Sequence, residues 1–137
     1  MWPLFSRLSL AGLLLISPVA GAHDASYFDS HPTPHGGQMR MAGPYHLEVV
    51  TDAGHLIVFV TDHAGTPLST AGWGGRAILL AGKQKREYSL QPWGANELRS
   101  ADTVTSDPDI KLVVSLAPVK APGEQARFTR LSLLHQP

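Results

Sequence analysis

The stretch YHLEVVTDAGHLIVFVTD, residues 45–62, carries the clearest structural signal in the chain. Two runs rich in apolar and β-branched residues, Tyr45–Thr51 and His55–Asp62, flank the short segment Asp52–Gly54. A three-residue loop with glycine in the left-handed region is typical of a β-hairpin. We expect this hairpin to close with Thr51 opposite His55. Side-chain alternation then predicts the following inward-facing residues: Leu47, Val49, Ile57 and Phe59.

Short β-type runs separated by turn residues continue on both sides of this hairpin. The six further runs are Gln38–Ala42, Arg76–Ala81, Lys85–Leu90, Glu97–Ala101, Asp109–Leu116 and Ala126–Leu134. Near the end, the predicted core residues are Leu112, Val114, Leu116, Leu131 and Leu133. Short strands at this spacing predict one all-β domain over residues 38–137, a small antiparallel β-sandwich or a partly closed barrel.

The N-terminal segment has the pattern of an export signal. Arg7 precedes the apolar run Leu8–Ile16, and Ala20-Gly21-Ala22 fits the small-residue rule for cleavage, so residues 1–22 are interpreted as a signal peptide. Cleavage after Ala20 is the alternative. We therefore expect a periplasmic protein without a membrane span after cleavage. Residues 23–37, rich in His and Pro, are predicted to form an extended arm.

Composition excludes several classes of function. The 137 residues include 11 basic and 11 acidic side chains and no cysteine. This balance gives no footprint for nucleic acid, and thiolate chemistry of any kind is absent. Neither a phosphate-binding glycine loop nor a Gly-x-Ser-x-Gly elbow occurs in the sequence. We expect a protein that is not an enzyme.

Histidine is the unusual residue, because six of the seven histidines lie between positions 23 and 63. Imidazole is a common ligand of Zn and Cu. His46 and Glu48 are two apart on a strand and so share a face. The expected hairpin register adds Asp62 to that face, with His63 beside it and the arm close by. The predicted metal ligands are His35, His46, Glu48, Asp62, His63, His31 and His23. Each is also compatible with an ordinary surface or loop position.

Two other features bear on copper. Met39 and Met41 alternate on a strand and fit either packing or ligation of Cu(I). Cleavage after Ala22 would give His23 a free α-amine beside its imidazole, a pair that chelates Cu(II), whereas cleavage after Ala20 would give a Gly-Ala-His start. An N-terminal His brace for copper-dependent oxidation is the enzymatic hypothesis, although a domain this small with few aromatic residues offers little platform for a substrate.

The segments His35-Gly36-Gly37, Tyr45-His46-Leu47-Glu48 and Asp62-His63 form an HGG…YHxE…DH pattern. This pattern resembles small exported bacterial proteins and the N-terminal segments of heavy-metal efflux adaptors, which accompany copper, zinc or cobalt export systems. The resemblance implies a metal-resistance context and points to His35, His46, Glu48, Asp62 and His63. Because no membrane-fusion or hairpin segment of an adaptor is recognisable, we expect a free-standing version of the module.

Besides the enzymatic hypothesis, the sequence supports two hypotheses of function. The first is a periplasmic, non-catalytic accessory protein that carries or buffers a Cu or Zn ion, with a metal-efflux or envelope complex as its partner. The second is an exported interaction module that docks onto an envelope complex, with histidines that are incidental or pH-responsive.

Overall fold

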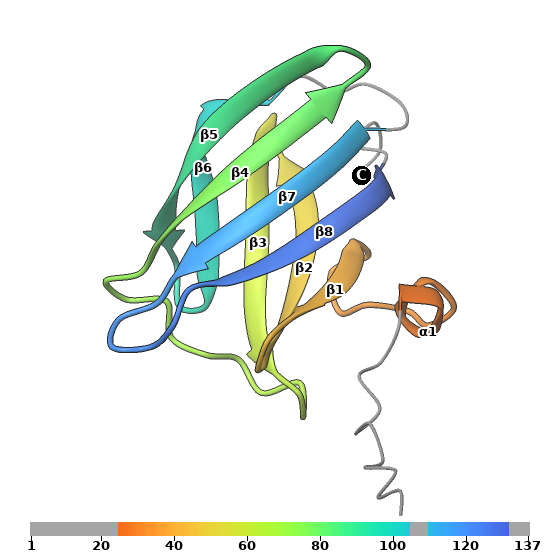
Figure 1. Cartoon of the computed structure of the whole chain (residues 1–137). Coiled ribbons are helices and arrows are strands. Elements are labelled where there is room, and N and C mark those ends of the chain that lie inside the picture. Colours follow the sequence, from red (N-terminus) through yellow and green to blue (C-terminus); the bar gives the residue numbers. More distant parts are fainter. Residues whose placement is uncertain (1–24, 105–109, 132–137) are drawn as a thin grey trace, which may run out of the picture.

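The computed structural model describes residues 25–104 and 110–131. The predicted signal peptide, His23 and Leu133 lie outside these residues. The predicted all-β class is confirmed, with eight antiparallel strands in a nearly closed, barrel-like sheet (Figure 1). The strands are β1 (Gln38–Ala42), β2 (Tyr45–Asp52), β3 (His55–Asp62), β4 (Gly74–Ala81), β5 (Gln84–Trp93), β6 (Glu97–Thr103), β7 (Ile110–Ala117) and β8 (Glu124–Leu131).

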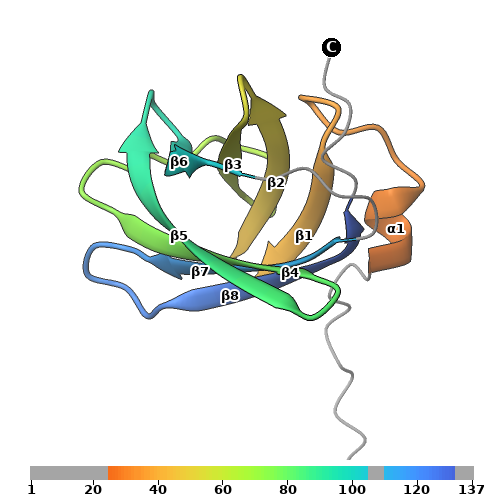
Figure 2. The same cartoon turned by 90° about the horizontal axis from the view of Figure 1, so that it is seen from above.

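The sheet has the strand order β1-β2-β3-β6-β5-β4-β7-β8. Its two end strands, β1 and β8, contact each other, and Gln38 Nε2 donates to the Thr129 carbonyl oxygen at 3.4 Å. The sheet therefore curls into two facing walls. Viewed from above, β1, β2, β3 and β6 form one wall, and β4, β5, β7 and β8 form the other (Figure 2). We call these the first wall and the second wall.

The space between the walls is filled by apolar side chains. Alternate residues of each strand point inward, as expected for a sheet with one face on the core. The largest fully buried apolar side chains are Phe128, Leu47, Leu56, Leu79, Leu98, Ile110, Leu112, Val49, Val58, Val60 and Val114. The predicted inward positions Leu47, Val49, Leu112, Val114 and Leu116 are thus confirmed.

The β2–β3 turn differs from the prediction by one residue. Asp52, not Thr51, lies opposite His55. The loop therefore contains only two residues, Ala53 and Gly54, with φ angles of 47° and 79°. Two successive positive φ values are typical of the type I′ hairpin turn, whose twist matches that of the strands.

This one-residue shift reverses the faces of β3, because side chains alternate with a period of two. The prediction that Ile57 and Phe59 face the core is wrong, since Leu56, Val58 and Val60 occupy the inward positions. Ile57 and Phe59 instead share the outer face of the first wall with Glu48, which pairs directly with Phe59.

Ahead of β1, residues 25–37 form what we call the arm. The arm was predicted to be extended, but it begins with one short helix, α1 (Ala25–Asp29), before an irregular segment that ends at Gly37. Figure 1 shows α1 beside β1, outside the barrel. No helix within residues 25–104 and 110–131 has the length and apolar character needed to cross a membrane.

Candidate functional site

The arm covers part of the outer face of β2. His46, Glu48 and Val50 point away from the barrel core, yet they are only 7%, 2% and 8% exposed. On an uncovered antiparallel sheet, this face would contact water. Phe28 of α1 packs edge-on against His46 with ring centroids 5.1 Å apart, and Gly37 approaches the Val50 side chain. The arm thus creates a second, smaller interior outside the barrel.

Glu48 fastens the arm to the sheet. Its Oε1 accepts hydrogen bonds from the backbone N–H groups of His35 and Gly37, both at 2.9 Å. Its Oε2 accepts a third from His35 Nδ1 at 2.8 Å. A buried carboxylate without such donors would be strongly destabilising. We call this arrangement of His35, Gly37 and Glu48 the clasp, because it joins the arm to β2.

The two glycines of the HGG segment are both required by this geometry. Gly36 has a φ of 73°, in the left-handed region that glycine adopts without strain. A Cβ on Gly37 would lie only 2.3 Å from the carbonyl oxygen of Val49, so no larger residue fits there. The His35 ring completes the clasp by stacking on Phe59, with ring centroids 3.6 Å apart and planes within 1°.

A second anchor holds α1 against β1. Arg40 Nη1 and Nη2 donate to the two carboxylate oxygens of Asp29 at 2.8 and 3.2 Å. Arg40 is buried, whereas half of the Asp29 side chain is exposed. The hydrogen bond from Arg40 lowers the pKa of Asp29 below its ordinary value of 3.8. The helix is therefore attached by a bidentate ion pair, the strong form of such a contact.

Between the arm, the outer face of β1–β3 and the turn after β3 lies a pocket of about 380 Å³. We call it the arm pocket. It brings together three histidines, His31 from the arm, His46 from β2 and His63 from the turn. The rings of His46 and His63 are stacked with centroids 4.9 Å apart. The other lining residues are Tyr27, Phe28, Pro32, Thr33, Pro34, Met39, Thr61, Ala64 and Gly65.

Hydrogen bonds fix which ring nitrogen of two of these histidines can bind a ligand. His63 Nε2 is 3.1 Å from the Gly43 carbonyl oxygen, and His31 Nδ1 is 2.7 Å from the Tyr27 carbonyl oxygen. A carbonyl only accepts, so these nitrogens carry the protons. The neutral rings therefore keep a lone pair on His63 Nδ1 and on His31 Nε2. Metal-binding histidines commonly have their other ring nitrogen fixed in this way.

The donors of the arm pocket suit a borderline or soft metal ion. Imidazole favours Zn and Cu, and the thioether of Met39 adds a donor that favours Cu(I). None of the described residues that line the pocket carries a carboxylate. Among residues 25–104 and 110–131, no three His, Asp or Glu side chains already form a group arranged to hold a metal ion. The pocket thus gathers suitable donors without a closed set of ligands.

The remaining predicted ligands have other surroundings. His35 and Glu48 form the clasp, where each oxygen of Glu48 already accepts hydrogen bonds. Asp62 lies opposite Tyr45, on the inward side of β3, because of the shifted register. Its Oδ1 accepts from the N–H groups of Ala64 and Thr66 at 2.8 and 2.9 Å and so shapes the turn that carries His63.

Sequence reasoning missed the aromatic and ionic anchors of the arm. Tyr27 and His31 are four residues apart, and their rings stack with centroids 4.0 Å apart. This spacing is the signal that could have revealed α1. No comparable signal links Asp29 to Arg40, because the contact depends on how the arm folds back over β1.

A second, smaller pocket of about 240 Å³ lies elsewhere on the outer surface, over β3, β6 and β5. It is lined by His55, Gln91, Trp93, Arg99, Ser100 and Ala101. Arg99 lies over the Trp93 ring, 4.8 Å from its centroid, and Trp93 is 55% exposed. His55 Nδ1 donates to the Ser100 carbonyl oxygen at 2.9 Å. Among the described residues that line this pocket, His55 is the one histidine, and they form no cluster of metal ligands.

Comparison of the chain with protein-family models, with curated proteins and with solved structures gave no match. The function proposed below therefore rests on the residues of the arm pocket, together with the pattern noted in the sequence.

Proposed function

We propose that this chain is an exported, periplasmic accessory protein that binds a Cu or Zn ion and has no catalytic activity. The observation that carries the proposal is the convergence of His31, His46 and His63 on the arm pocket. The export pattern of residues 1–22 and the resemblance of the HGG…YHxE…DH pattern to proteins of metal-resistance systems support the same context.

The expected ligands come from three separate segments of the chain. His46 belongs to β2, whereas His31 and His63 are exposed and lie on the arm and on the turn. A metal ion bound by His31 and His63 would join the arm to the turn. Binding to the folded state alone also stabilises a protein by mass action. Metal should therefore raise the unfolding temperature as well as occupy the site.

The test is calorimetric titration of the protein, purified without chelators or a histidine tag, with Zn and with Cu. We expect one equivalent to bind. The double variant His31→Ala/His63→Ala should weaken binding at least about 100-fold, or roughly 2.7 kcal/mol. The matched control is His55→Ala, which removes an imidazole from the second pocket and should leave affinity unchanged. Absence of binding, or equal affinity in the double variant, would refute the proposal.

A pair of methionine variants tests the contribution of the thioether in the same titrations. Met39 lines the arm pocket, whereas Met41, on the same strand and face, does not. We expect Met39→Leu to lower the affinity for Cu(I) by roughly tenfold, or 1.4 kcal/mol, and to leave the affinity for Zn unchanged. Met41→Leu is the control and should change neither affinity.

The second candidate function is an interaction module that docks onto an envelope complex. It is favoured by the exposed Trp93 with Arg99 stacked over it, since Trp and Arg are the residue types enriched at the energetic centres of interfaces. A partner recovered by crosslinking from the wild-type protein, and lost with Trp93→Ala, would support this function. If equal amounts of the partner were recovered with the wild-type protein and with Trp93→Ala, the surface around Trp93 and Arg99 would be excluded as the docking site.

A further inference from the structure

Charge is distributed unevenly over the described residues, although the chain as a whole is neutral. The second wall and its loops, residues 74–93 and 110–129, carry two acidic side chains, Glu87 and Glu124. The seven basic side chains of these segments are Arg76, Lys83, Lys85, Arg86, Lys111, Lys120 and Arg127. Residues 25–73 and 94–104 carry two basic side chains, Arg40 and Arg99. Their six acidic side chains are Asp29, Glu48, Asp52, Asp62, Glu97 and Asp102.

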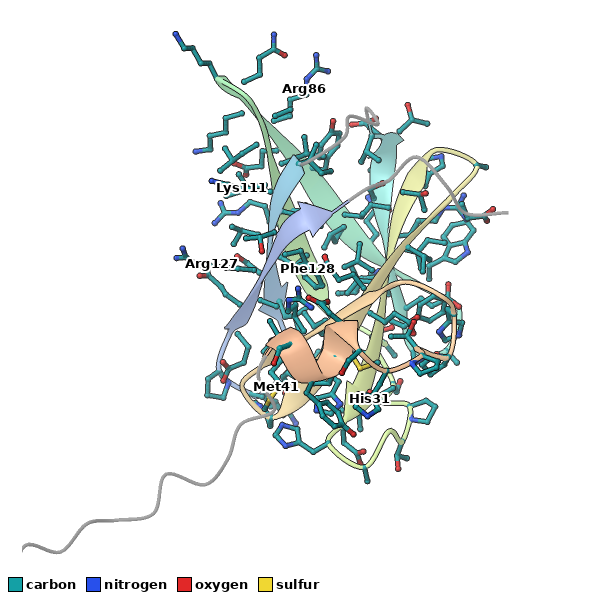
Figure 3. All side chains as sticks on the ribbon, turned by 90° about the vertical axis from the view of Figure 1, so that its right-hand side faces the viewer. His31, Met41, Arg86, Lys111, Arg127 and Phe128 are labelled. Carbon is teal, nitrogen blue, oxygen red and sulfur yellow. The ribbon has the colours of Figure 1, made fainter. Side chains whose placement is uncertain are left out.

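Four basic residues of the second wall share its outer face by strand register, whereas Arg86 pairs with the inward-facing Leu79. The four are Arg76, Lys85, Lys111 and Arg127. The strand register places Leu80 directly between Lys85 of β5 and Lys111 of β7. In the neighbouring row, Ile78 and Val113 lie between Glu87 of β5 and Arg127 of β8. In Figure 3, Lys111 and Arg127 project from the same side of the molecule, and Arg86 lies farther along toward the β4–β5 turn. We call these rows and the turn residues beside them the basic face.

The charges of the basic face are largely uncompensated. Within the part of the chain that the structure describes, Lys85, Lys111 and Arg127 belong to no ion pair. Arg76 is paired with Glu87 at 3.4 Å, and both side chains are about half exposed. The face therefore presents several long, flexible cationic side chains around half-buried aliphatic ones.

We propose that the basic face docks onto the anionic surface of a phospholipid bilayer. Charge complementarity identifies the partner as anionic. The mixture of residues favours lipid over protein, because protein interfaces are depleted in lysine and enriched in aromatic residues. The rows described contain three basic side chains, three aliphatic ones and Glu87, without an aromatic ring. Basic side chains beside an anionic membrane each add to its affinity.

The orientation that follows keeps the arm pocket accessible. The basic face belongs to β4, β5, β7 and β8, and the arm pocket lies outside β1, β2 and β3, on the opposite wall (Figure 2). A molecule docked through its second wall thus presents His31 and His63 to the aqueous side. The docking proposal does not depend on metal binding, since it rests on a different surface.

The test is sedimentation with large vesicles of phosphatidylcholine that contain either no or 50% phosphatidylglycerol. Protein purified after export should bind the anionic vesicles and not the neutral ones, and rising salt should release it. Neutralising one basic side chain should weaken binding about fivefold, so Lys111→Gln/Arg127→Gln should weaken it about 25-fold.

The matched control is Arg99→Gln, which removes the same charge from the first wall and should leave binding unchanged. Equal loss in Arg99→Gln and Lys111→Gln would overturn the proposal, because it would show a response to net charge rather than to this face. Equal binding to neutral and anionic vesicles would also overturn the proposal. So would the absence of binding to anionic vesicles, including the case in which an acidic protein binds through Lys111 and Arg127 instead. All of these positions are on the surface, and circular dichroism verifies that the variants fold.

Discussion

The two walls of the barrel are both built from antiparallel strands, but their outward-facing residues differ in burial. On β2, the outward residues His46 and Glu48 are almost fully buried. On β4 and β7, the outward residues Leu80 and Lys111 are half-buried and exposed. The difference arises from the arm, which covers part of the first wall, including the outer face of β2, and leaves the outer face of β4 and β7 uncovered. The polarity of the outward-facing side chains of a strand therefore does not determine whether those side chains are buried.

The same contrast applies to two glutamates. Glu48 accepts three hydrogen bonds from a segment 11–13 residues away and is 2% exposed. Glu87 makes one long ion pair with Arg76, and both partners are about half exposed. Exposed pairs of this kind contribute little to stability, whereas a buried acceptor leaves unpaired donors when it is removed.

The largest expected effect is that of Glu48→Ala compared with Glu87→Ala. Removing Glu48 leaves the N–H groups of His35 and Gly37 without their acceptor and creates a cavity under the arm. We expect the free energy of unfolding to fall by about 3 kcal/mol. Glu87→Ala should change it by less than about 0.5 kcal/mol. Urea unfolding measures both values, and equal losses would contradict the difference between the walls.

Two glycines provide the next comparison. In Gly37→Ala, the new Cβ would clash with the Val49 carbonyl oxygen, so the arm must move away from β2. We expect a loss of about 2 kcal/mol, in the range of overpacked sites. Gly74→Ala on β4 is the control, because its Cβ would meet no atom within 4 Å. Urea midpoints that are equally lowered in both variants would show that the close approach at Gly37 is not what fixes the arm.

The smallest expected effect concerns pH. Because Arg40 lowers the pKa of Asp29 in the folded state, the ion pair stabilises the fold above the ordinary value of 3.8. This contribution is lost as the pH falls from there through the lower folded pKa. With half of its side chain exposed, Asp29 should contribute less than about 1 kcal/mol.

The measurement is the difference in urea midpoint between pH 7 and pH 3 for wild type and Asp29→Asn. The variant should show the smaller difference, whereas Glu87→Gln on the second wall should behave like wild type. An unchanged difference in Asp29→Asn would exclude the ion pair as an anchor of α1.

Much of the barrel could be predicted from the sequence, because hydrophobic runs and turn residues mark the strands. The runs Gln38–Ala42 and His55–Asp62 coincide with the observed strands β1 and β3. The register of β2 with β3 could not be predicted, since the two-residue turn places Ala53 at a positive φ, a conformation that alanine rarely adopts. The resulting shift of the register by one residue places Ile57 and Phe59 on the outer face of β3 instead of in the core.

The candidate site was predicted less completely. The concentration of histidine in the first part of the chain led to the prediction of His31, His46 and His63 as ligands, and these three residues line one pocket. The alternation rule placed His46 and Glu48 on one face, which the structure also shows, but it carries no information on what covers that face. The role of Glu48 in the clasp depends on the path of the arm, and that path is set by tertiary contacts.

The residues that line the arm pocket are also close together in the sequence. The described residues that line it all come from one block of the chain, residues 27–65, whereas the two end strands of the barrel meet through Gln38 and Thr129, 91 residues apart. The possible metal ligands of the arm pocket, His31, Met39, His46 and His63, are thus encoded by one short stretch of the gene. Insertions or substitutions in the loops after β4 can vary the remainder of the protein without altering that stretch, so the pocket and the basic face can evolve separately.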